Sequence, residues 1–386
     1  MSSSDALAEG IPGNYYTGRA DQIEKKFLPA TQVSNEVVWV NPEIEIPLRL
    51  KVGEPTDLGV FLTPSPSGVN TTRLEISPIH RRSAILGRAV FKDKDGKFYR
   101  DIDLKGIGFV TEEGGVGAVG KTKVVDIDGV LGRLEIAKAL QHQEISEALL
   151  KAGIRTYRDL AIIKLNQIIN ANGQAISIED AIKAGILDEG SQPAIEVRGF
   201  TTKYRVADVE AFDWMFGLGG LGTRELKLSK GRIPEGLKRP KRALLRDAMA
   251  IAAQEQGVDP DLFTEKDYIL WFARTLGATI GRMHKSGWSH SYLTPHNITL
   301  DARIADLEGV DQIDITKDQR QKQKEIAQVI VHYLITDVFL TSPELEIDKQ
   351  YETLLADAKK SYQEAYQAEV SIGFPAKIRR VFSKKT

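Results

Sequence analysis

The chain has 386 residues, too many for one simple core, and 42% of them are hydrophobic, so we expect two lobes or domains with ordinary globular packing. Its 52 Lys and Arg against 53 Asp and Glu leave a net charge of −1, and this balance does not point to DNA, RNA or an anionic membrane as a partner. The absence of cysteine excludes disulfides, thiolate metal sites and a cysteine nucleophile.

The first 80 residues are rich in Pro, Ser, Thr and Asn, with one clear strand-like run, EVVWV, at 36–40. This composition predicts an irregular N-terminal arm, residues 1–80, lying on the main body. The N-terminus lacks a basic start followed by an apolar run, and no stretch approaches 18 uninterrupted apolar residues. We therefore expect a cytoplasmic protein that does not contact a membrane.

Residues 81–206 carry most of the strand signals. The pattern RAVFKDKDGKFYRDIDLKG (88–106) alternates apolar and polar residues around an Asp-Gly turn, which predicts a hairpin. A helix is expected from about 133 to 152, and RDLAIIKLNQIINAN (158–172) also has a helical pattern. AIEVRGF (194–200) is strand-like again.

From about residue 207 the sequence becomes mostly helical. Earlier in the chain, within 81–206, Ser177 to Asp180 resembles a capping box that opens a short helix. The predicted longer helices lie at about 207–216, 241–256, 265–285, 318–338 and 348–369. The order of elements predicts an α+β protein of two lobes, with a strand-rich N-lobe at 81–206 and a helical C-lobe at 207–386.

Two glycine-rich segments match nucleotide-binding patterns. GVGAVGKT (115–122) fits the phosphate-binding pattern G-x-x-x-x-G-K-[ST], but it leads into the β-branched KVVDIDG and not into a helix. GLGGLG (217–222) fits G-x-G-x-x-G without the strand before it and the helix after it that a dinucleotide fold requires. We interpret both as loops, and keep a P-loop at 115–122 as an alternative.

The strongest functional signal lies at 290–309. A protein kinase has a catalytic loop H-R-D-x-x-x-x-N and a metal-binding D-F-G turn, and HSYLTPHN (290–297), followed by ADLEG, fits this frame without a gap. Asn297 and Asp306 are then the predicted ligands of Mg²⁺ or Mn²⁺. Tyr292 takes the position of the catalytic Asp, and a phenol is a poor base at neutral pH.

Several segments together resemble the selenoprotein O family. They are RAVFKDKDGKFYRDIDLKGIG, EISEALLKAGIRTYRDLAI, AIEVRGFTTKYRVADVEAF, HSYLTPHNITL and ADLEG, in the same order over roughly residues 85 to 310. Members of this family have a kinase fold without the usual catalytic Asp. The resemblance implies a protein-kinase-like fold that binds ATP in a flipped orientation and transfers AMP to protein hydroxyls.

The resemblance also implies roles for single residues. Lys105 would contact the phosphates, and a glutamate of the predicted helix would pair with it. We favour Glu144, because it shares a helix face with Leu140 and Ala148, although an ungapped match puts His142 at that position. Arg198 and Arg205 would hold the terminal phosphates, because planar guanidinium groups suit phosphate oxygens. The remaining implied roles are nucleotide contact at Gly87 and Arg88, the base at His296, and the metal ligands Asn297 and Asp306.

The residues leave other functions open. The chain could be an atypical kinase that transfers the γ-phosphate, or an inactive scaffold that binds nucleotide, because Tyr292 replaces the catalytic Asp. A zinc site at His284, His290 and His296 is a weaker alternative, since their six-residue spacing fits no helix or strand period. We expect ATP and an unidentified hydroxyl-bearing acceptor as partners, and no nucleic acid, because the basic clusters 238–242 and 377–385 are typical of solvated surfaces.

Overall fold

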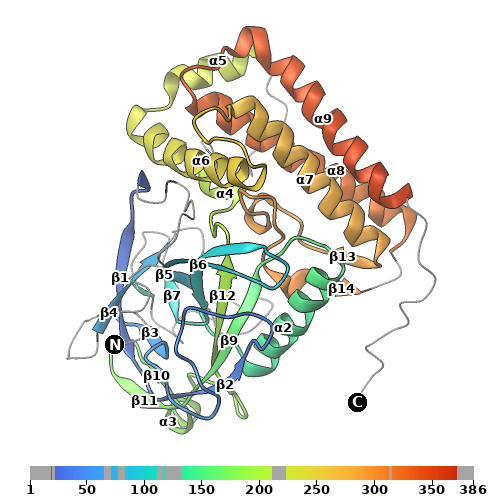
Figure 1. Cartoon of the computed structure of the whole chain (residues 1–386). Helices are drawn as coiled ribbons and strands as arrows, with labels where there is room; N and C mark the ends of the chain where they lie inside the picture. The colour runs from blue at the N-terminus through green and yellow to red at the C-terminus, as the bar shows by residue number, and fades with distance from the viewer. Residues whose placement is uncertain are drawn as a thin grey trace.

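An antiparallel sheet of eight strands organises the first half of the chain (Figure 1). The computed structural model describes residues 19, 22–64, 71–76, 83–110, 116–117, 132–210, 223–312 and 315–371. Within these ranges the strand order is β2-β9-β12-β6-β5-β4-β1-β3. The strands are β1 (Lys26–Gln32), β2 (Asn35–Val40), β3 (Val60–Leu62), β4 (Thr71–Ile76), β5 (Ser83–Lys92), β6 (Phe98–Lys105), β9 (Arg158–Leu165) and β12 (Ala194–Phe200).

The predicted hairpin is confirmed as β5 and β6, which are antiparallel neighbours. Asp93 and Lys97 close the turn through a backbone hydrogen bond of 2.9 Å, and Gly96 has a φ of 77°, a left-handed conformation that favours glycine. The hairpin places Lys105 at the end of β6, directly opposite Glu196 of β12.

The irregular arm predicted for residues 1–80 is wrong for its described part. Strands β1 to β4 belong to the main sheet, where β1 pairs with both β3 and β4, and β2 pairs with β9. Many residues of β1 and β2 are only half-buried or exposed, so polar side chains and Pro29 are tolerated and the alternation is weak in the sequence.

The helix predicted at 158–172 is also wrong. Residues Arg158–Leu165 form β9, between β2 and β12, and Gln167–Ile169 form β10, which pairs with β11 (Ala175–Ser177). A continuous apolar run suits a strand buried on both faces as well as a helix, and here the two flanking strands decide the outcome. The predicted helix start is confirmed, since Ser177 accepts a 3.0 Å hydrogen bond from the Asp180 amide at the start of α3 (Ile178–Lys183), although Asp180 bonds the Ser177 hydroxyl and does not complete a capping box.

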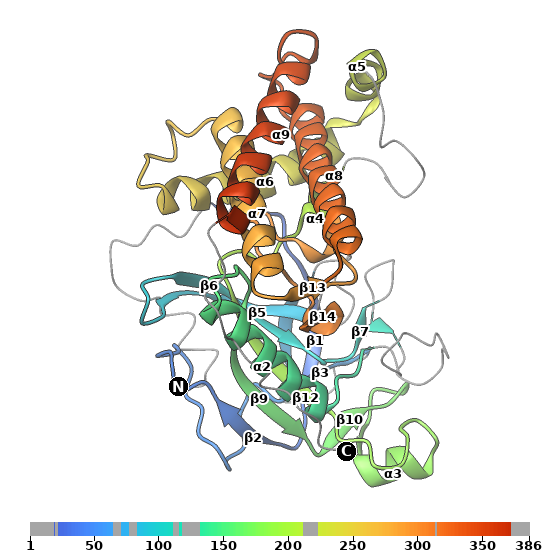
Figure 2. The same cartoon turned by 90° about the vertical axis from the view of Figure 1, so that its right-hand side faces the viewer.

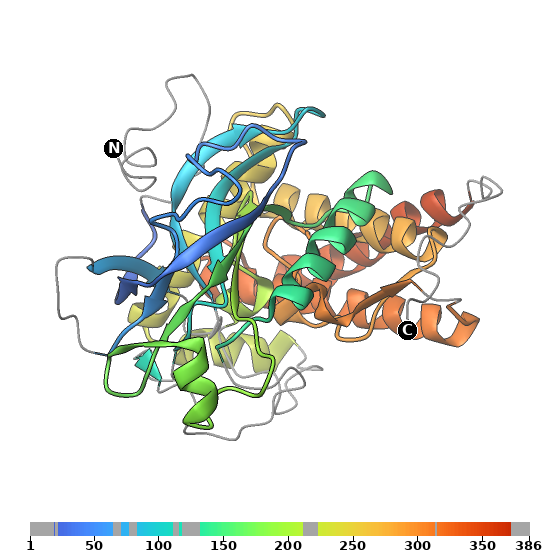
Figure 3. The same cartoon turned by 90° about the horizontal axis from the view of Figure 1, so that it is seen from below.

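The second half of the described chain is helical, as predicted, so the α+β class is confirmed. Figure 3 shows the sheet on one side and the long helices on the other. The helices are α2 (Ile136–Lys151), which packs against β9 and β12 (Figure 2), then α4 (Val206–Val209), α5 (Thr223–Arg232), α6 (Glu235–Glu255), α7 (Glu265–Lys285), α8 (Lys317–Thr341) and α9 (Ile347–Ser371). Among the helices described, none combines the length and the apolar composition that crossing a bilayer requires.

Helices α7 and α9 approach each other closely at a glycine. A Cβ atom at Gly277 would lie 2.3 Å from the Tyr362 carbonyl oxygen, a backbone atom that cannot move aside cheaply. We expect Gly277→Ala to destabilise the protein by about 1–3 kcal/mol, although alanine favours helices. Gly236→Ala in α6 is the control, since nothing lies within 4 Å of its Cβ, and thermal unfolding should be unchanged or slightly higher. Equal melting temperatures for the two variants would contradict this close packing.

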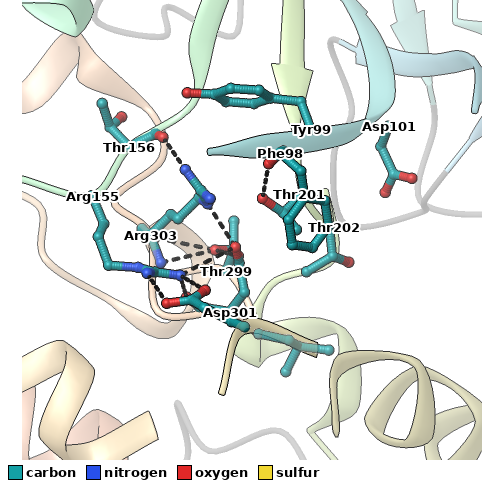
Figure 4. A network of polar contacts seen from close by, with 12 residues as sticks. Phe98, Tyr99, Asp101, Arg155, Thr156, Thr201, Thr202, Thr299, Asp301 and Arg303 are labelled. Carbon is teal, nitrogen blue, oxygen red and sulfur yellow. Dashed lines mark hydrogen bonds and ion pairs between the residues drawn. The ribbon is translucent and has the colours of Figure 1, made fainter. Parts of the chain in front are cut away.

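Buried ion pairs join the sheet to the helices. Arg100 of β6 is 1% exposed and binds both carboxylate oxygens of Asp247 in α6, at 2.7 and 3.0 Å. In the network of Figure 4, Arg303 donates to Asp301 at 2.6 Å and to the Thr156 carbonyl at 3.0 Å. These contacts fix the loop after α7 against the strands, and this loop carries the 290–309 motif.

Candidate functional site

The 290–309 motif folds into two short turns joined by a tight loop. Asn297 ends the 3-10 turn η3 (Pro295–Asn297), and its side-chain amide donates to the Tyr292 carbonyl at 2.7 Å. Asp306 precedes the second turn, η4 (Leu307–Gly309), and has a left-handed backbone with φ 59° and ψ 77°. The Ala305 amide donates to the Asn297 carbonyl at 2.8 Å, which holds the two predicted metal ligands in adjacent loops.

Lys105 reaches this turn from the sheet. Its Nζ lies 2.5 Å from Glu308 Oε1 and 3.3 Å from Asp306 Oδ1, and the residue is only 4% exposed. The structure thus brings together Lys105 and Asp306, which are 201 positions apart in the chain. Glu308 was not singled out from the sequence, because the glutamate of DLEG has no counterpart in the D-F-G pattern.

Arg205 lies on the other side of the two loops. Its Nη1 donates to the His296 carbonyl and is 3.4 Å from Asn297 Oδ1. Burial lowers the pKa of Arg205, and the nearby Asp306 carboxylate opposes that shift. The Nε atom is buried without an acceptor among the residues that the structure describes.

Arg198, the second predicted arginine, is buried inside the sheet. Its Nε donates to Asp103 Oδ2 at 2.9 Å, and Lys203 contacts the other oxygen of the same carboxylate. Burial opposes the charged form of Arg198, but the contact with Asp103 prevails and raises its pKa. Two cations thus share one buried carboxylate. Neither Asp103 nor Lys203 was singled out from the sequence, although both lie in segments quoted for the resemblance, because their contact joins positions that are 100 apart in the chain.

Arg88 does not join the other predicted site residues. It makes two hydrogen bonds to Glu75, at 2.6 and 2.7 Å, and its Nε is 3.2 Å from Asp101. Its neighbour Gly87 is half-buried in β5, opposite Ile102. These contacts give Arg88 a structural role that links three elements, and they do not direct it toward Lys105.

The pairing predicted between Glu144 and Lys105 does not occur. Glu144 lies on the exposed face of α2, whereas His142 is fully buried. His142 Nδ1 is 3.1 Å from Glu196 Oε2, and burial lowers the pKa of this histidine. Leu140, which was used to predict the buried face of α2, is itself 39% exposed, so the predicted buried face was wrong.

Two buried carboxyl groups, those of Glu196 and Asp159, lie in β12 and β9, the next two strands of the sheet beside Lys105. Glu196 also accepts a 3.0 Å hydrogen bond from the Tyr157 hydroxyl, and its pKa is lowered despite burial because His142 and Arg198 lie nearby. Asp159 is equally buried, and burial beside Glu196 raises its pKa well above the usual range. The two carboxyl groups therefore form a coupled pair in which the negative charge is favoured on Glu196.

The three histidines of the zinc alternative do not form a common site. His284 is bonded to Tyr366 and Gln323 within the helices, His290 lies under the loop, and His296 is exposed. No group of three or more His, Asp or Glu side chains in metal-binding proximity occurs among the described residues. The exposed His296 lies beside Asn297 in η3, apart from the other two histidines.

His290 holds the loop in its neutral form. The Tyr292 amide donates to its Nδ1 at 3.2 Å, so Nε2 carries the proton and donates to the Ala305 carbonyl at 3.3 Å. Burial is the main cause that lowers the pKa of His290. Protonation would remove the acceptor for the Tyr292 amide.

The protonation of His290 predicts a pH dependence of stability. Because its folded pKa lies below the unfolded value of about 6.5, the unfolded state binds more protons, and stability falls as pH decreases below that value. We expect His290→Asn to flatten this dependence by up to about 1.4 kcal/mol per pH unit between pH 6.5 and 5. Urea unfolding at several pH values measures this. An unchanged slope would mean that the pKa of His290 is the same in the folded and unfolded states.

Other predicted features have structural roles or lie outside the described residues. Lys241 and Arg242 of the basic cluster 238–242 donate to the carbonyls of Glu210 and Thr341. The glycine segment 217–222 and the basic tail 377–385 lie outside the described residues, as does 115–122 apart from Val116 and Gly117 in the short strand β8 (Val116–Gly117). The P-loop alternative therefore stays untested.

The residues of this region fit a metal-bound polyphosphate. Asp306, Glu308 and Asn297 offer the oxygen atoms that Mg²⁺ or Mn²⁺ prefers, and the Asp306 side chain is 28% exposed. Lys105 and Arg205 supply positive charge on either side of them. No protein-family model matches the chain, and no curated protein matches its sequence.

Proposed function

We propose that this chain is a transferase with a two-lobed, protein-kinase-like fold, which binds ATP with Mg²⁺ or Mn²⁺ and transfers AMP to a hydroxyl group. One observation carries the proposal: Lys105, Arg205, Asn297 and Asp306 come from three distant segments and lie around the same pair of loops. The kinase motif predicts Asn297 and Asp306, and the resemblance implies Lys105 and Arg205.

The order of elements supports the kinase-like part of the proposal. In a protein kinase, the phosphate-contacting lysine lies on a strand, a helix follows it, and the catalytic and metal-binding loops come after a helical segment. Here Lys105 ends β6, α2 follows, and the 290–309 motif comes directly after α7. Helix α2 packs against two strands of the main sheet, β9 and β12.

The proposed chemistry is an attack by the acceptor hydroxyl oxygen on the α-phosphorus of ATP. The new bond joins that oxygen to phosphorus, the bond between the α-phosphorus and the bridging oxygen breaks, and pyrophosphate leaves. His296, exposed at the edge of the loop, would take the hydroxyl proton, because a histidine can act as a base near neutral pH. Lys105 and Arg205 would balance the charge that develops on the leaving group.

A bound Mg²⁺ or Mn²⁺ would supply further neutralisation of the phosphate oxygens. Asp306 and Asn297 would hold it through their carboxylate and amide oxygens. For that, Asn297 Oδ1 has to exchange its long 3.4 Å contact with Arg205 for the metal, and Arg205 would turn toward the phosphates. The 3.4 Å contact itself is weak, so the main cost of this exchange is the hydrogen bond that Arg205 Nη1 donates to the His296 carbonyl.

One observation favours γ-phosphate transfer as a second candidate. The flipped orientation of ATP uses both arginines, but Arg198 is 1% exposed and held by Asp103. In its present position Arg198 can act on phosphates only through its charge. An atypical kinase with ATP in the ordinary orientation does not need this residue.

The deciding experiment uses ATP labelled at either the α- or the γ-phosphate, incubated with purified protein and Mg²⁺ or Mn²⁺. Label retained from the α position alone is the expected result and supports AMP transfer. Label retained from the γ position alone would make the protein a kinase. If neither label is retained but Mg-ATP raises the melting temperature, the third function, a nucleotide-binding scaffold, is the better description.

A further inference from the structure

Lys105 is held by the turn after the metal ligand. Glu308 Oε1 is 2.5 Å from Lys105 Nζ, compared with 3.3 Å for Asp306 Oδ1. The Glu308 side chain is 14% exposed and that of Asp306 is 28% exposed. The shorter and more buried contact is therefore the one with Glu308, and a charge-assisted bond of this kind is among the stronger ones in proteins.

Helix α2 offers no carboxylate to this lysine. Its two acidic residues are Glu144, which is exposed, and Glu147. Glu147 makes two hydrogen bonds of 2.9 Å to Arg158 and accepts another of 2.9 Å from Asn41. The buried position that faces the sheet is occupied by His142, which is bonded to Glu196. A kinase-like site built on this chain therefore has to hold its lysine from another element.

The turn that carries Glu308 is fixed on both sides. Leu307 is fully buried, and a Cβ atom at Gly309 would lie 3.0 Å from the Tyr292 ring and 3.2 Å from His290 Nδ1. Close packing at both neighbours leaves little freedom for the backbone of residue 308. The carboxylate of Glu308 is thus presented to Lys105 by a rigid segment.

We propose that Glu308 is the positioning residue for Lys105, in the place of a helix carboxylate. Glu308 keeps the lysine amine over the loops, beside Asp306, the proposed metal ligand. The inference rests on the proposed function, because Lys105 is there a phosphate-contacting residue. It also couples the lysine and the metal ligand to one turn, so that a movement of residues 306–309 displaces both together.

Chemical labelling of Lys105 without nucleotide tests this inference. We expect Glu308→Gln to raise the rate at which an amine-reactive reagent modifies Lys105 by about tenfold, because the amine loses its closest partner. Glu144→Gln is the matched control and should leave the rate unchanged. Glu308→Asp, which keeps the charge, should give an intermediate rate and serves if the Gln variant does not fold. Peptide mass spectrometry measures all four proteins.

Equal labelling of Lys105 in wild type and Glu308→Gln would overturn the inference, as would faster labelling in Glu144→Gln. A kinetic readout then tests the effect on the reaction. Glu308→Gln should lower kcat/KM for ATP by about tenfold, with Glu144→Gln unchanged. If the wild-type protein transfers no label from ATP, the proposed function fails, but the labelling rates still decide whether Glu308 positions Lys105.

Discussion

Replacing Asp306 with asparagine should reduce transfer from ATP by about 10³-fold or more. The substitution keeps the shape of the side chain and removes the charge that the proposed metal ion needs. Asparagine also adopts the left-handed backbone conformation that residue 306 has, so the turn should keep its structure. Lys105 would still be held by Glu308 at 2.5 Å, which separates loss of the metal ligand from loss of the lysine.

Asp311→Asn provides the matched control for this variant. Asp311 is exposed in β14 (Val310–Gln312), five residues further along the chain, and its replacement should leave the rate unchanged. Initial rates with labelled ATP at several Mg²⁺ concentrations are the measurement, together with melting temperatures for all three proteins. Wild-type turnover in Asp306→Asn would remove the central metal ligand from the proposal.

The largest effect on stability is expected from Arg100→Met. This variant removes the two hydrogen bonds that Asp247 accepts from Arg100 and the two, of 2.7 and 3.2 Å, that Asp101 accepts from it, and both carboxylates are buried. Breaking one side of a buried ion pair costs about 3–5 kcal/mol. Denaturant unfolding should report a loss of this size.

Two further variants make that measurement specific. Arg73→Met removes an exposed arginine on β4 whose guanidinium lies 5.8 Å from the Phe27 ring, and it should cost less than about 1 kcal/mol. Arg100→Met combined with Asp247→Asn should be less destabilised than Arg100→Met alone, because one unpaired buried charge is gone. Additive effects in the double variant would show that the two side chains do not interact.

Part of this site could be predicted from the sequence alone, because the motif residues of a loop are recognised by their fixed spacing along the chain. Asn297 and Asp306 were identified from their distance to His290, and a long helix that ends in glycine marked where the loop begins. Lys105 was implied by the resemblance, and it lies in a segment with the pattern of a hairpin. In each case the residue lies on a segment whose conformation is decided by its own neighbours.

The incorrect predictions depend on contacts between distant segments. Residues 158–165 form a strand because β2 and β12 pair with them on both sides, which their own pattern does not reveal. Glu144 was chosen by helix rotation, but the buried face of α2 is set by the bond between His142 and Glu196. Glu308 was missed because its partner Lys105 is 203 positions away in the chain.

Because Asp306 has a left-handed backbone, folding stability and the proposed metal site favour different residues at this position. A non-glycine residue in this conformation costs about 1 kcal/mol, and glycine would relieve the cost but provide no carboxylate. Selection for thermal stability alone would therefore drive the position toward glycine. Aspartate at this position lowers folding stability, and activity is what favours it. Laboratory evolution for heat resistance without an activity screen should therefore lose Asp306 early.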